Sequence, residues 1–89
     1  MNGTVRLNED VVEWRQVDDE IVALDRTANE YIAITGSGAL LWPLLLAGAT
    51  EEALAQALVD RFGVGREVAA TDVGRFVADL AARGLLEHR

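Results

Sequence analysis

The segment Glu20–Gly38, EIVALDRTANEYIAITGSG, contains two short runs of apolar and β-branched residues separated by a polar stretch. Such runs, when bounded by turn residues, are typical of two strands of a β-hairpin. The segment predicts strands at Glu20–Asp25 and Glu30–Ile34, joined by a turn in which Asn29 is best suited to a left-handed backbone. The closing GSG ends the sheet.

The residues before this hairpin also have β character. Val11–Val17 is rich in β-branched and aromatic residues, and Val5 and Leu7 alternate with a polar residue. Asp18 and Asp19 supply turn chemistry, because Asp side chains bond to their own backbone. We therefore expect a meander of three antiparallel strands.

The residues after the hairpin have helical spacing. Ser37 is a candidate N-cap for a first, apolar helix, and Thr50 is the N-cap of a second helix that ends near Phe62. A third helix is predicted over Glu67–Arg83. Gly84 is its C-cap, with the following LL sequence as the hydrophobic contact of a Schellman motif.

Three strands followed by three helices place the chain in the α+β class. An antiparallel sheet must bury at least one face, and helices packed on one side do so. The prediction is a three-stranded antiparallel sheet followed by three helices, in a winged-helix-like arrangement. The 89 residues suffice for one domain, residues 1–89.

The charge of the chain limits its partners. The net charge is −7, and the basic residues are scattered. Binding to phosphate backbones requires a basic surface, so nucleic acid and anionic membranes are poor partners, whereas a basic peptide is a plausible one. The N-terminal MNGTVRLNED lacks signal-peptide features, and the longest apolar run, Ala39–Ala47, is far shorter than a membrane span. We expect a cytoplasmic protein.

Residues for catalysis are scarce. The chain has no cysteine, and its single histidine, His88, is expected to be a frayed terminal residue. Ser37 has no histidine near it in the sequence, and the paired carboxylates lie in a turn and in the first turn of a helix. The sequence predicts no enzyme, no metal site and no cofactor.

The chain carries an ordered set of short motifs, at Leu24-Asp25, Tyr31, Gly38-Ala39, Trp42, Gly48, Thr50, Asp72-Val73 and Gly84-Leu85-Leu86. This ordered set resembles the PqqD family of leader-peptide binders, also called RiPP recognition elements. The resemblance covers roughly residues 20 to 86, and the sequence is most similar to the stand-alone leader-binding proteins of lasso-peptide biosynthesis.

The resemblance implies a non-catalytic adaptor. In the family, the leader of a precursor peptide adds as an antiparallel strand to the edge of the third strand of the meander, and its apolar side chains lie beside the last helix. Main-chain hydrogen bonds then supply affinity and side-chain pockets supply specificity. An apolar edge strand is otherwise an aggregation hazard, so the composition of Glu30–Ile34 agrees with this mode of binding.

The resemblance also implies the site residues. The strand would contribute Glu30, Tyr31, Ile32, Ala33 and Ile34, and the helix would contribute Asp72, Val73, Phe76, Val77, Asp79 and Leu80. Val73, Phe76 and Leu80 also fit a plain core stripe, because a helix packed on a sheet shows the same spacing.

The expected function is to hold a precursor peptide for a partner leader peptidase and then a cyclase. One alternative is a PqqD-type peptide chaperone that serves a radical enzyme. The other is a winged-helix DNA-binding regulator, which the fold permits and the acidic charge disfavours.

Overall fold

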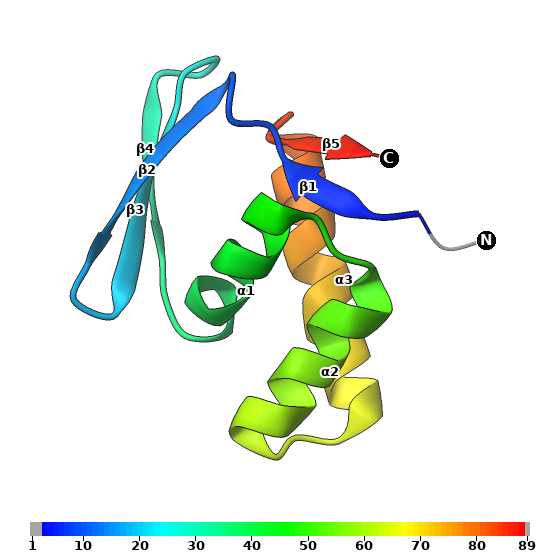
Figure 1. The fold of residues 1–89 in the computed structure, drawn as a ribbon. Helices are drawn as coiled ribbons and strands as arrows, with labels where there is room; N and C mark the ends of the chain where they lie inside the picture. Colours follow the sequence, from blue (N-terminus) through cyan, green and yellow to red (C-terminus); the bar gives the residue numbers. More distant parts are fainter. Residues whose placement is uncertain (1–2, 89) are drawn as a thin grey trace.

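The computed structural model describes residues 3–88 and shows a small sheet beside a group of helices (Figure 1). The elements in chain order are β1 (Val5–Leu7), β2 (Val12–Val17), β3 (Glu20–Asp25), β4 (Glu30–Ile34), α1 (Ser37–Ala47), α2 (Glu51–Phe62), α3 (Arg66–Ala82) and β5 (Leu86–His88).

Strands β2, β3 and β4 form the predicted antiparallel meander in that order. The register places Trp14 opposite Ala23, and Ala23 opposite Ile32. Both turns contain a residue with a left-handed backbone, Asp18 and Asn29, each with φ 56°. The predicted α+β fold, a three-stranded antiparallel sheet followed by three helices, is confirmed.

A second sheet was not predicted. β1 pairs antiparallel with β5, so that Leu7 lies opposite Leu86, and Val5 also bridges to Ala49. The expectation of a frayed His88 is wrong for its backbone, which pairs with that of Val5. Two chain ends that are each too short to form a sheet alone stabilise one another.

The C-terminal end of α3 is the predicted Schellman motif. Gly84 has φ 75°, its N–H donates to the Ala81 carbonyl at 3.0 Å, and the Leu85 N–H donates to the Leu80 carbonyl at 3.0 Å. This pattern satisfies carbonyls that a helix end otherwise leaves unpaired. It also turns the chain back, so that β5 can reach β1.

Of the two predicted N-caps, Thr50 is correct and Ser37 is wrong. Thr50 caps α2, because its Oγ1 accepts a hydrogen bond from the Ala53 N–H at 3.1 Å. Ser37 is not a cap: it is the first residue of α1, and Gly36 holds the cap position with φ 59° and ψ −128° and no side-chain bond. Only glycine adopts that backbone region readily.

The core lies between the sheet and the helices. Its largest fully buried side chain is Trp42 of α1, and buried leucines from β1 and all three helices belong to the same core. The indole of Trp14 from β2 meets Trp42 edge to face, with ring centroids 6.4 Å apart. No helix within residues 3–88 has the combination of length and apolar character that a membrane span needs.

Candidate functional site

The two faces of β4 differ sharply. Ile34 is only 6% exposed and Ile32 is half-buried, whereas Tyr31 on the opposite face is 76% exposed. The register agrees, because Ile32 lies opposite the buried Ala23 and Tyr31 lies opposite Leu24. Alternation along a strand therefore turns the two isoleucines toward the helices and leaves the tyrosine in solvent.

β4 is also an edge strand. Within residues 3–88, no strand pairs with its second edge. The other edge strand of this sheet, β2, carries charged side chains on its outer face, Glu13 and Arg15, and such charges are one way in which proteins protect an edge. β4 is thus the less protected of the two edges.

A recess of about 280 Å³ lies between β4 and α3. Its walls come from the end of β4, the start of α1 and the second half of α3. The lining residues are Ile32, Ala33, Ile34, Thr35, Ser37, Gly38, Phe76, Asp79 and Leu80.

Close packing around Gly38 sets one end of this recess. A Cβ atom on Gly38 would lie 2.8 Å from Ile34 Cγ2 and 3.0 Å from Phe76 Cε1. A larger residue there would have to displace the strand or the aromatic ring. The bare backbone of Gly38 therefore lets β4, α1 and α3 meet at one point.

Ion pairs lie beside the opposite end, where Asp79 lines the recess. Arg83, directly after α3, donates from Nη1 to Glu30 Oε1 at 3.3 Å and from Nε to Asp79 Oδ2 at 3.4 Å. Glu30 is the first residue of β4, so the guanidinium links the strand to the helix across the recess. Two carboxylates share one guanidinium, which leaves this end of the recess with a net negative charge.

Most of the predicted site residues gather around this recess. Ile32, Ala33, Ile34, Phe76, Asp79 and Leu80 line it, and Glu30 stands at its end. Tyr31 belongs to the same strand but to its outer face. Asp72 is exposed and lies one helical turn before Phe76 on the same face of α3.

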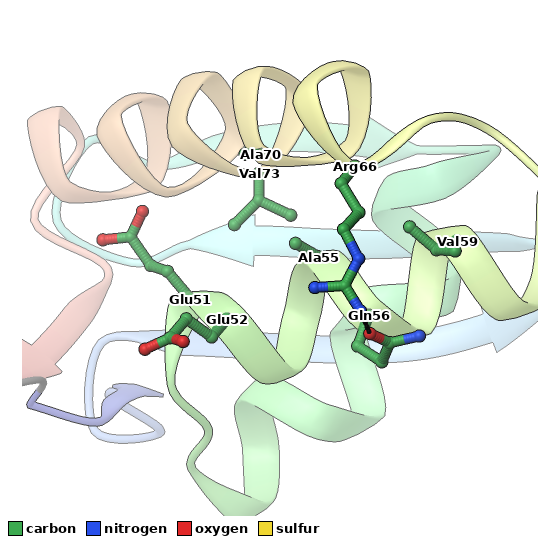
Figure 2. Close-up of a pocket in the computed structure, with 8 residues that line it drawn as sticks. All are labelled: Glu51, Glu52, Ala55, Gln56, Val59, Arg66, Ala70 and Val73. Carbon is green, nitrogen blue, oxygen red and sulfur yellow. Dashed lines mark hydrogen bonds between the residues drawn. The ribbon is translucent and has the colours of Figure 1, made fainter.

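Two of the predicted residues lie elsewhere. Val77 is a buried core residue, and Val73 is buried and borders a different recess, between α2 and α3. Figure 2 shows this second recess, of about 330 Å³, with Glu51 and Glu52 at one side and Arg66 at the other. The Arg66 Nη2 donates to Gln56 Oε1 at 3.4 Å. No sequence pattern indicates this recess, because its walls are residues typical of any exposed helix pair.

Sequence reasoning did not assign Thr35, Ser37 and Gly38 to the site, although they line the recess, and it also missed Arg83 beside it. The position of Arg83 directly before the C-terminal glycine of α3 suggested only the end of a helix. Its link to Glu30 joins residues 53 positions apart, and no local pattern reports such a contact. The charges at this end of the recess therefore emerge only from the folded chain.

The chemistry of the β4–α3 recess is that of a binding surface. It combines an unpaired strand edge, apolar side chains and an ionic end. Within residues 3–87 no group of three or more aspartate or glutamate side chains is placed to hold a metal ion. An extended peptide fits such a surface, since its backbone can pair with the edge while alternate side chains enter the recess.

Comparison with known proteins gives a family and two similar structures. The family described as "Coenzyme PQQ synthesis protein D (PqqD)" matches residues 20–86. None of the curated proteins matches the sequence.

Both similar structures contain a leader peptide. "TbiB1 in Complex with the TbiA(beta) Leader Peptide" is 29% identical with a TM-score of 0.84, covering 92% of this chain and 94% of that chain. "Lasso peptide synthetase B1 complexed with the leader peptide" is 29% identical with a TM-score of 0.80, covering 93% of this chain and 96% of that chain.

Proposed function

This chain belongs to the PqqD family, and on that basis we propose that it is a leader-peptide-binding protein of lasso-peptide biosynthesis. The two similar structures support the proposal, because each is a complex with a leader peptide and each matches this chain over nearly its full length. The function is that of a PqqD-like RiPP recognition element, a non-catalytic adaptor.

The observation that carries the binding mode is the unpaired edge of β4 beside the β4–α3 recess. A leader segment adds to this edge as a fourth, antiparallel strand of the meander. Backbone hydrogen bonds provide affinity that depends little on sequence, and the recess provides selection among side chains. Ile32, Ile34 and Phe76 form the apolar contact surface for the leader.

The adaptor acts on the precursor by holding it. A bound leader keeps the rest of the precursor near a partner leader peptidase and then near a cyclase. Tethering of this kind raises the local concentration of a substrate to about millimolar levels when the linker is short and flexible. It accelerates processing without any catalytic group on the adaptor itself.

An NMR titration tests the proposal. The probe is a synthetic peptide with the leader sequence of the precursor encoded beside this protein, added to ¹⁵N-labelled protein. We expect chemical-shift changes concentrated at residues 30–34 and at Phe76, Asp79 and Leu80, with intermolecular NOEs between the leader backbone and β4.

Two results would contradict the proposal. If the leader peptide did not bind at millimolar concentration, the proposed leader-binding function would be wrong. Saturable binding with shifts confined to the α2–α3 recess would keep leader binding but overturn strand addition at β4. A scrambled peptide of the same composition serves as the control for charge-driven association.

A further inference from the structure

The Glu30–Arg83–Asp79 ion pairs lie where a strand added to β4 would end. Glu30 is the first residue of β4, and Arg83 links it to the C-terminal end of α3. Ile34, at the other end of β4, and Phe76 of α3 both lie against Gly38. β4 and α3 therefore run in opposite directions along the two walls of the recess.

The direction of β4 fixes the direction of an added strand. An antiparallel partner enters beside Ile34 and leaves beside Glu30, and every second side chain turns inward, with inward positions roughly 7 Å apart. The first two inward positions lie beside Ile34 and Ile32 and meet apolar side chains. The third lies beside Glu30 and meets the ion pairs.

The charge at this third position is unbalanced. The carboxylates of Glu30 and Asp79 share the single guanidinium of Arg83, and both carboxylates are well exposed, whereas the Arg83 side chain is partly buried. Exposed ion pairs contribute little to stability, so these carboxylates can turn toward an additional cation without disrupting the fold. The net charge of −7 of the whole chain also favours a cationic ligand.

We propose that Glu30 and Asp79, positioned by Arg83, select a basic side chain in the leader. The inference rests on the proposed function and adds a sequence requirement to it. Read from the N-terminus, the bound segment carries apolar residues at the first and third positions and lysine or arginine at the fifth.

The experiment uses three versions of the same leader peptide. Intermolecular NOEs identify the leader residue beside Glu30, and that residue is made Lys, Met or Glu. Dissociation constants are measured by isothermal titration calorimetry at 20 mM and 500 mM NaCl, chosen to bracket weak and strong screening. At low salt we expect the Lys peptide to bind about fivefold more tightly than the Met peptide, and the Glu peptide to bind most weakly. At high salt the differences in affinity among the three peptides should become smaller, because the charges are screened.

Two protein variants test whether Glu30 and Asp79 cause the preference for the Lys peptide. In Glu30→Gln/Asp79→Asn the three peptides should bind with similar affinities. The variant Glu13→Gln/Glu51→Gln also removes two negative charges, one from the outer face of the sheet and one from α2, and should keep the preference for Lys.

The outcomes separate the two proposals. Equal affinities of the three peptides for the wild-type protein overturn the selection of a basic residue while leader binding stands. A preference for Lys that survives in Glu30→Gln/Asp79→Asn also overturns it. Failure of all three peptides to bind the wild-type protein contradicts the proposed function itself.

Discussion

Gly38 and Ile34 are in direct contact at the point where the sheet passes into the helices. A Cβ atom on Gly38 would lie 2.8 Å from Ile34 Cγ2, closer than side chains tolerate. Ile34 is the last residue of β4 and Gly38 is the second residue of α1, so this close approach joins the candidate binding edge to the first turn of the helix.

The substitution Gly38→Ala should therefore destabilise the protein and weaken leader binding. The added methyl group overpacks the contact with Ile34 and Phe76, at a cost of about 1–3 kcal/mol in unfolding free energy. Urea denaturation followed by circular dichroism measures the stability, and calorimetry measures leader affinity.

A matched control is Gly74→Ala, because Gly74 lies inside α3 with open space around its Cβ position. That change should stabilise the protein by about 0.5–1 kcal/mol through helix propensity alone. If Gly38→Ala were also stabilising, the proposed role of the close contact would be wrong.

Phe76→Ala should weaken leader binding by about 10- to 100-fold. The ring lines the β4–α3 recess, and burial of an aromatic side chain against a ligand is worth ~1.5–3 kcal/mol. Fluorescence anisotropy of a labelled leader peptide measures the change, with circular dichroism to verify folding.

Phe62→Ala is the control for this change, because Phe62 is exposed at the end of α2. Its leader affinity should equal that of the wild type. Phe76→Leu keeps the apolar volume and should lose less affinity than Phe76→Ala; equal affinities of the wild type and both Phe76 variants would exclude the recess as the contact surface.

Asp25→Ala should lower the unfolding free energy by about 1–3 kcal/mol. The buried Asp25 Oδ1 accepts hydrogen bonds from the Thr27 N–H at 3.0 Å and the Ala28 N–H at 3.2 Å, and so holds the β3–β4 turn. Asp25→Asn retains an oxygen acceptor and should cost less. If thermal denaturation showed a larger loss of stability for Asp25→Asn than for Asp25→Ala, this role of the Asp25 carboxylate would be wrong.

Thr50→Ala should cost about 1 kcal/mol of stability, because it removes the N-cap of α2. Thr50→Ser keeps the hydroxyl and should remain within a few tenths of a kcal/mol of the wild type. Chemical denaturation of the three proteins compares them, and equal losses for Ala and Ser would show that the methyl group, not the hydroxyl, matters.

Much of the fold follows from local sequence. The bounds of β3, β4 and α2 agree with the prediction, because turn residues and caps mark both ends of each element. Asn29 and Thr50 illustrate this: a left-handed turn and an N-cap depend on one residue and its nearest neighbours.

The features that were missed depend on contacts between distant residues or on backbone geometry. The β1–β5 sheet joins the two ends of the chain, and the Arg6–Glu87 ion pair across it at 3.0 Å links residues 81 positions apart. Ser37 fits a cap by residue type, but the backbone of Gly36 takes that position instead.

The sequence by itself determined that β4 is an apolar strand, that its successive side chains face opposite ways, and that helices must cover the sheet, because alternation and capping are local properties of the chain. Only the tertiary structure decided which way each side chain of β4 faces. It turned Ile32 and Ile34 toward the recess and Tyr31 toward solvent, and it brought Arg83 to Glu30. The physical reason is that the position of α3 against the sheet is set by the summed packing of many distant residues, which no short stretch of sequence contains.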